Sequence, residues 1–215
     1  MKNIFLLFLI IFLFSSCEKE EITDSISIGN IYCSDGSTIN PANYSGSEKK
    51  AVGVIFWVSP QNNSSEPKAL AVGLEDLVPA LWADSLIAIK NVSTDLFEFN
   101  GVSNTASIVS WGIDESRKTT AITNAYKYSY LGVVGWFVPS FGEAKFLYSQ
   151  KNTVQSSLSI CGGNMLSDWY WTSTQDGSGS DNSKLNAVAI SQSEGNATVS
   201  YKLNVFPVRP IIAIK

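Results

Sequence analysis

The chain has 215 residues, a formal net charge of −4 and no histidine. Its scattered Lys and Arg residues form no basic stripe, so we expect no nucleic-acid partner, and without histidine neither a Ser-His nor a Cys-His nucleophile pair can form. Aromatic residues make up 12% of the chain and Gly and Ser are plentiful, which suits a β-rich, loop-rich secreted domain rather than a helical bundle.

The N-terminus carries a short apolar run at residues 4–14, followed by Ser, Ser and Cys at residues 15–17. A helix of this run would be about 16 Å long, about half of a hydrocarbon core, so we predict a cleaved secretion signal rather than a membrane span. The small pair before a cysteine resembles a bacterial lipoprotein signal, in which residues 1–16 are removed and Cys17 receives a diacylglycerol. An ordinary signal with an incidental cysteine is the alternative, and Phe14 departs from the more usual Leu.

Residues 17–27 are predicted to be the acylated cysteine and an acidic tether, because residues 18–21 are all charged. Similar acidic stretches occur in surface-exposed lipoproteins of the Bacteroidetes, so this one resembles an export tag; a plain solvated linker is the alternative. Two or three acyl chains anchor a protein stably. We therefore expect an outer-membrane lipoprotein that contacts the membrane through its lipid and is exposed at the cell surface; a periplasmic orientation is the alternative.

The mature chain is short enough for one domain, which we place at residues 28–215. Apolar, β-branched and aromatic runs predict its strands. These are expected at residues 28–34, 51–59, 69–74, 86–89 (the weakest), 169–174, 185–190, 197–202 and 205–214. Two helices are expected between them, one at residues 116–130 and one that starts after Ser140 and has a break near Asn152.

The second helix has a recognisable start. Ser140 and Glu143 are spaced as in a capping box, in which a hydroxyl and a carboxylate each satisfy an orphan backbone N–H. We prefer this structural role to a catalytic one. Cys33 and Cys161 could pair in an oxidising envelope, which would stabilise the domain by about 4–5 kcal/mol in the chain-entropy model; two separate buried thiols are the alternative.

Three short motifs resemble a known family. Residues 135–143 (GWFVPSFGE) resemble a W-x-L-P-S-x-x-E signature, residues 171–174 (WTST) resemble the W-S-S-T that follows it, and residues 208–210 (VRP) resemble a closing V-R-P/A-V strand. Together they resemble the bacterial C-type-lectin-like domains of the Lcl C-terminal-domain type, which recur in Bacteroidetes surface lipoproteins and fimbrillin-like proteins. The opening segments at residues 28–36 and 52–56 are also similar to the start of such proteins.

This resemblance implies an α+β fold with small, mostly antiparallel sheets, two helices, long loops on one side and paired terminal strands. It also implies binding rather than catalysis. Formylglycine-generating enzymes share the fold but use paired cysteines near the C-terminal end of the domain. Cys33 lies at the opposite end of this chain and Cys161 has no close partner in sequence, so we do not expect that chemistry or any other enzyme activity.

Candidate ligand-binding residues are few. Trp82, Trp111 and Trp169 have the most loop-like neighbours and could stack on sugar rings, with a core position as the favoured alternative for each. Trp57, Trp136 and Trp171 lie in apolar runs and are expected in the core. The calcium motifs of animal lectins are absent, and the Asp-rich loop at residues 176–182 matches no known ligand spacing, so neither a metal nor another cofactor is expected.

These observations leave two hypotheses of different classes. The first is a non-enzymatic surface lipoprotein that binds a glycan or protein through the loop side of its domain. The second is a structural or accessory subunit of a fimbria-like surface assembly without a small ligand. Clustered exposed aromatics would favour the first, and an unpaired strand edge would favour the second.

Overall fold

The computed structural model describes residues 25–60, 67–179 and 181–215. The predictions for the secretion signal, for acylation of Cys17 and for the start of the tether fall on residues 1–24 and so lie outside the described residues. Within the described part of the chain, no helix has both the length and the apolar character that a membrane span requires.

The larger sheet has five antiparallel strands in the order β10-β4-β3-β1-β2. Its members are β1 (Ile31–Cys33), β2 (Thr38–Ile39), β3 (Ala51–Val58), β4 (Ala69–Gly73) and β10 (Ile211–Ile214). Strand β3 is the continuous apolar run, and it is buried along most of its length because core groups cover both faces of the sheet, one around Val54 and Phe56 and the other around Val52 and Ile55.

The predicted pairing of the terminal strands is wrong. Strands β1 and β10 belong to the same sheet, but β3 and β4 lie between them. The reason is that β1 and β4 pair with the two sides of β3 and β2 takes the outer side of β1, which leaves β10 the outer side of β4 in a register that sets Ile212 opposite Ala71.

A second sheet contains β6 (Trp169–Gln175), β7 (Asn186–Ser191) and β8 (Ala197–Tyr201), all antiparallel, and β5 (Ala80–Leu81) pairs with β9 (Val205–Phe206). The weak strand expected at residues 86–89 does not form. There the backbone N–H of Ile89 donates to the side-chain oxygen of Gln175 at 2.9 Å, so a side chain replaces the ladder partner. The small antiparallel sheets and the helices confirm the α+β class.

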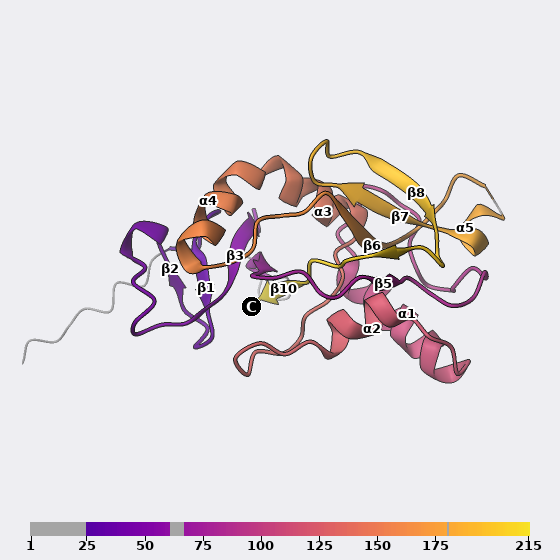
Figure 1. Ribbon diagram of the computed structural model, residues 1–215, viewed down its shortest axis with the longest axis horizontal. Coiled ribbons are helices and arrows are strands. Elements are labelled where there is room, and N and C mark those ends of the chain that lie inside the picture. The colour runs from indigo at the N-terminus through magenta and orange to yellow at the C-terminus, as the bar shows by residue number, and fades with distance from the viewer. Residues whose placement is uncertain (1–24, 61–66, 180) are drawn as a thin grey trace, which may run out of the picture.

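The described residues contain more helices than the two expected. They are η1 (Pro41–Asn43), α1 (Gly101–Asp114), α2 (Thr120–Lys127), α3 (Phe141–Ser149), α4 (Lys151–Cys161) and α5 (Asn182–Leu185). Only α2 forms within the helix expected at residues 116–130. The break predicted near Asn152 falls at Gln150, which ends α3 and precedes α4. Figure 1 shows α3 and α4 along one side of the molecule and α1 and α2 along the other.

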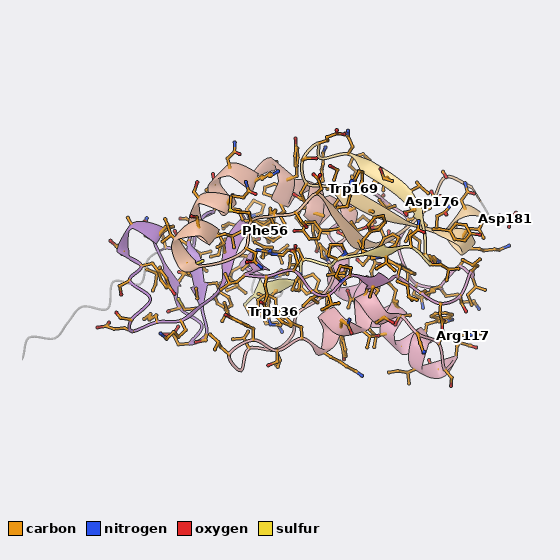
Figure 2. The ribbon with its side chains drawn as sticks, in the orientation of Figure 1. Phe56, Arg117, Trp136, Trp169, Asp176 and Asp181 are labelled. Atoms are coloured by element: carbon orange, nitrogen blue, oxygen red, sulfur yellow. The ribbon has the colours of Figure 1, made fainter. Side chains whose placement is uncertain are left out.

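Three groups of buried apolar side chains form the core. The first lies between the five-stranded sheet and helices α3 and α4 and includes Phe56 and Leu158. The second surrounds Trp171 and joins the three-stranded sheet to α1 and α2. The third covers the other face of the large sheet around Trp136. Figure 2 shows Phe56 and Trp136 in the part of the molecule formed by the large sheet.

Candidate functional site

Trp82 is not available to a ligand at the surface. Its side chain is 0% exposed, its indole N–H donates to the carbonyl of Thr172 at 2.8 Å, and the Nζ of Lys202 lies 4.8 Å from its ring centroid. The prediction of an exposed stacking residue is therefore wrong for Trp82. The prediction rested on the loop-like residues next to Trp82 in sequence. In the structure, Lys202 and Thr172, which are far away in sequence, cover the Trp82 side chain.

The other predicted stacking residues do not form an exposed platform with it. Trp111 on α1 and Trp169 at the start of β6 are half-buried, and both pack against the core group around Trp171. Ligand binding by Trp111 or Trp169 stays a prediction. The core positions expected for Trp136 and Trp171 are confirmed, since these side chains are 1% and 0% exposed.

The two mature cysteines are free thiols in the structure, so the disulfide left open by the sequence is not formed there. Cys33 is buried in β1, and Cys161 is half-buried at the end of α4 against the same core group. Burial raises the pKa of both thiols, with a smaller rise in the pKa of Cys33 from the nearby Asp35 carboxylate. Both behave as small apolar core residues.

The family-like motifs hold the fold together. In the VRP motif, the buried guanidinium of Arg209 donates to the carbonyls of Gly73, Leu74 and Asn164 at 2.7–2.9 Å and pairs with Asp76 at 2.9 Å. Asp76 also accepts a hydrogen bond from the hydroxyl of Tyr170, whose pKa is raised to about 12, mainly by burial and further by this carboxylate. The polar groups of Arg209, Asp76 and Tyr170 therefore bond to one another and to backbone carbonyls, and they join the C-terminal segment to β4 and β6.

An apolar pocket of about 690 Å³ lies at one end of the large sheet. Strands β3, β4 and β10 supply its floor, and the starts of α1 and α3 supply its walls. Its lining residues are Trp57, Pro60, Pro67, Leu70, Phe99, Val102, Phe137, Glu143, Ala213 and Lys215. The size and the mostly apolar lining suit a ligand or a segment of another chain.

Aromatic rings form one wall of this pocket. The ring of Phe99 lies 5.7 Å from the ring of Trp57, at an interplanar angle of 53°, and 6.1 Å from that of Phe146, nearly edge to face. Trp57 is half-buried and Phe99 is 42% exposed, so both rings combine rigid packing with access to solvent.

Glu143 places a carboxylate in the wall of the pocket. It completes the predicted capping box, since its Oε2 accepts a hydrogen bond from the Ser140 N–H at 2.7 Å and the Ser140 hydroxyl accepts one from the Glu143 N–H at 3.4 Å. Its Oε1 accepts a further bond from the Gly101 N–H at 3.4 Å. Burial raises the pKa of Glu143 to about 7, although these N–H donors oppose the rise.

Sequence reasoning missed this pocket. Trp57 was expected in the core because it lies in the apolar run of β3, and no pattern marked Phe99 or Val102. Glu143 had a complete local explanation as a helix cap. The pocket arises from contacts between segments far apart in sequence, which no local spacing reports. The sequence offered one signal for the pocket. Phe99 and Val102 are apolar residues in a segment otherwise rich in Asn, Ser and Asp.

Strand β8 forms an open edge of the three-stranded sheet. The N–H of Lys202 donates to the carbonyl of Leu185 and the N–H of Ser191 to that of Asn196, so the ladder to β7 uses the even-numbered residues of β8. Ala197 and Val199 therefore turn their backbone groups outward. Within residues 25–60, 67–179 and 181–215 these two residues have no backbone partner on that side.

This edge lacks two of the features that usually protect an edge strand, namely charged side chains and proline. The five residues of β8 (ATVSY) include no charge and no proline. Val199 is 49% exposed, and apolar residues continue past the strand to β9. The exposed members of this surface are Val199, Tyr201, Leu203 and Val205.

A second, shorter open edge borders the pocket. Ile211 in β10 exchanges two hydrogen bonds with Phe137 on the side away from β4. By alternation, the N–H and C=O of Ala213 point to that same side. In the described part of the chain they have no backbone partner there, and the side chain of Ala213 lines the pocket.

No group of three or more His, Cys, Asp or Glu residues that could hold a metal ion occurs among the described residues. In the Asp-rich loop, Asp176 accepts a hydrogen bond from the Ser178 N–H at 2.9 Å, and Asp181 pairs with Lys184 at 2.6 Å. Figure 2 shows both aspartates at the end of the molecule beside α5. These contacts shape the loop and fix the start of α5.

Comparison with known proteins gives one informative likeness. No protein-family model and no curated protein match the chain. The fold resembles the crystal structure of a fimbrial protein from Bacteroides ovatus, with a TM-score of 0.59 and 17% identity over 87% of this chain. The match covers 49% of that protein, so this chain spans about half its length. At this identity the likeness concerns the fold alone, and the C-type-lectin-like assignment stays a prediction.

Proposed function

We propose that this protein is a non-enzymatic subunit of a fimbria-like assembly at the cell surface, held in the outer membrane by lipid on Cys17. The observation that carries the proposal is the open, uncharged edge of β8 with its exposed apolar residues. The likeness in fold to a fimbrial protein supports it. The burial of Trp82 counts against the glycan platform that was the other hypothesis.

The edge can join two protein chains without any further change in fold. An extended segment of a neighbouring subunit would pair with the outward groups of Ala197 and Val199 and extend the three-stranded sheet by one strand. Backbone hydrogen bonds would fix the register, and the exposed side chains of Val199 and Tyr201 would pack on the added strand.

The variant Val199→Pro tests this proposal. The Val199 N–H points outward and takes no part in the ladder to β7, so proline removes the donor that a docking strand needs and leaves the sheet paired. We expect wild-type protein to co-purify with polymers sheared from the cell surface and Val199→Pro to be absent from them, although it reaches the surface in equal amounts.

The matched control is Val199→Thr, which retains the N–H and the branched side chain and should be incorporated normally. Both variants should show wild-type circular dichroism and melting temperature within a few degrees. Normal incorporation of Val199→Pro would show that β8 is not the joining edge. Wild-type protein that is never found in a polymer would overturn the assembly role itself.

A further inference from the structure

The pocket beside β10 has a chemical character that the edge of β8 lacks. Apolar and aromatic groups form most of its lining, while Glu143 contributes a carboxylate whose side chain is almost wholly buried. We propose that this pocket binds a lysine side chain of an extended polypeptide segment that pairs with Ala213. The lysine stem would lie against Trp57 and Phe99, and its ammonium group would reach Glu143.

The backbone geometry favours an extended segment over a free small molecule. Residues 211, 213 and 215 alternate onto one face of the sheet, and the side chains of Ala213 and Lys215 line the pocket. A segment that hydrogen-bonds to the outward N–H and C=O of Ala213 would turn every second side chain toward that same face. Backbone pairing and side-chain insertion would therefore occur together.

The charge in the pocket favours a cationic side chain. Glu143 has two backbone N–H donors, from Ser140 and Gly101, and neither carries a full charge. A carboxylate in an apolar wall gains most from a charge-assisted hydrogen bond to an ammonium group. The aromatic faces of Trp57 and Phe99 also attract a cation that passes over them.

The other charged side chains near the pocket do not take the place of a cationic partner for Glu143. Glu98, in the segment against the start of α3, directs its carboxylate to Ser93 and Asn100 at 2.9 and 2.7 Å. Lys215 lines the same pocket but is exposed, so its ammonium group can stay in water. The buried position of Glu143 also raises its pKa to about 7, as expected for a carboxylate without a cationic partner.

The test uses capped five-residue peptides with a central lysine between valine and threonine residues, and the same peptide with norleucine in the central position. Norleucine keeps the apolar stem and lacks the ammonium group. At pH 8 we expect wild-type protein to bind the lysine peptide about tenfold more tightly than the norleucine peptide, as followed by Trp fluorescence and calorimetry. Lowering the pH to 5 should remove this preference because Glu143 becomes protonated.

Two variants separate charge from helix capping. Glu143→Gln keeps one oxygen that can accept from the Ser140 N–H, places its amide group at the Gly101 N–H and has no charge, so it should bind both peptides equally. Ser140→Ala weakens the cap but keeps the carboxylate, so it should retain the lysine preference if it is folded by circular dichroism. If Glu143→Gln does not fold, the pH dependence of the wild-type preference decides.

Each outcome bears on the proposal. Norleucine binding as tight as lysine would overturn the role of Glu143, and binding of neither peptide would overturn the pocket as a docking site. Hexylammonium that binds as tightly as the lysine peptide would show that backbone pairing with Ala213 contributes nothing and that the ligand is a free amine. None of these results depends on β8, so the assembly proposal is tested separately.

Discussion

The carboxylate of Glu143 and the backbone N–H of Gly101 lie 3.4 Å apart and join the starts of two helices. Glu143 belongs to the capping box of α3, and Gly101 is the first residue of α1, whose N-cap Asn100 makes no side-chain capping bond. One buried carboxylate thus serves two positive helix ends, which fixes how α1 and α3 meet at the wall of the pocket.

We predict that Gly101→Ala destabilises the protein by about 2–4 kcal/mol, because an added Cβ would collide with the Glu143 carboxylate, the Val138 carbonyl and the Ser140 nitrogen. Chemical denaturation measures the loss. Val102→Ala is the control, since that side chain is 55% exposed and its loss should change the free energy of unfolding by about 0.5 kcal/mol or less. Equal stability of Gly101→Ala and wild type would contradict the close contact.

The raised pKa of Glu143 predicts a dependence of stability on pH. Its pKa is about 7 in the folded protein against 4.5 when unperturbed, so the folded state binds more protons between these values. Stability should therefore fall as pH rises from about 4.5 to 7, by up to about 3 kcal/mol. Denaturation at several pH values should show this fall in wild type and a smaller one in Glu143→Gln. Identical slopes would exclude Glu143 as the cause.

Lys202 should act in the opposite direction and at higher pH. Burial lowers its pKa from 10.5 to about 7, so the unfolded chain binds the extra proton between these values and stability should rise with pH across that window. Lys202→Met should flatten this rise. The same unfolding measurements, made from pH 7 to 10.5, give the result, and a rise that persists in Lys202→Met would assign it to another group.

Lys202→Met should also be less stable than wild type at pH 7. The Nζ of Lys202 donates to the Ile87 carbonyl, the Gln175 side chain and the Ser183 carbonyl at 2.7–2.9 Å. Methionine would remove this donor from all three acceptors, although the Gln175 oxygen keeps the Ile89 N–H, at a cost of about 1–3 kcal/mol. Lys184→Met is the matched control, because Lys184 is exposed and its ion pair with the nearby Asp181 lies at the surface. Equal losses in the two variants would contradict a specific role for Lys202.

Arg209 makes the strongest structural prediction. Its planar group bonds three carbonyls and Asp76, a set that an ammonium group cannot match. Arg209→Lys should lower the free energy of unfolding by about 3–5 kcal/mol. Arg117 is an exposed arginine in the turn between α1 and α2 and provides the control. Arg117→Lys should leave the free energy of unfolding unchanged in the same thermal or chemical unfolding experiment. A small effect of Arg209→Lys on the free energy of unfolding would show that the bonds of the guanidinium to the three carbonyls and Asp76 are dispensable.

Local patterns in the sequence predicted most strands and the start of α3. Strands such as β3 and β6 are rich in β-branched or aromatic residues, and the capping box of Ser140 and Glu143 is complete within four residues. Helix α1 was missed because its buried positions include Asn104 and Thr105, which interrupt the apolar stripe that marks a helix.

The burial of Trp82 and the apolar pocket could not be predicted from local sequence patterns, because both depend on residues far apart in the chain. Trp82 is buried by Lys202, and the pocket joins Trp57, Phe99, Glu143 and Ala213 from four separate segments. Whether β10 pairs with β1 or β4 depends on which strand sides remain open after the neighbouring strands have paired. Such relationships are set by the three-dimensional arrangement, and residue spacing along the chain does not encode them.

Hydrogen exchange at the amides of Ala197 and Val199 tests the assembly proposal most directly. Both N–H groups point outward from β8, so in the isolated protein they should exchange quickly, while the ladder amides of Thr198 and Ser200 are protected. In the assembly purified from the cell surface, we predict that the outward pair becomes protected to the level of the ladder pair. Fast exchange of Ala197 and Val199 in both states would contradict strand addition at β8.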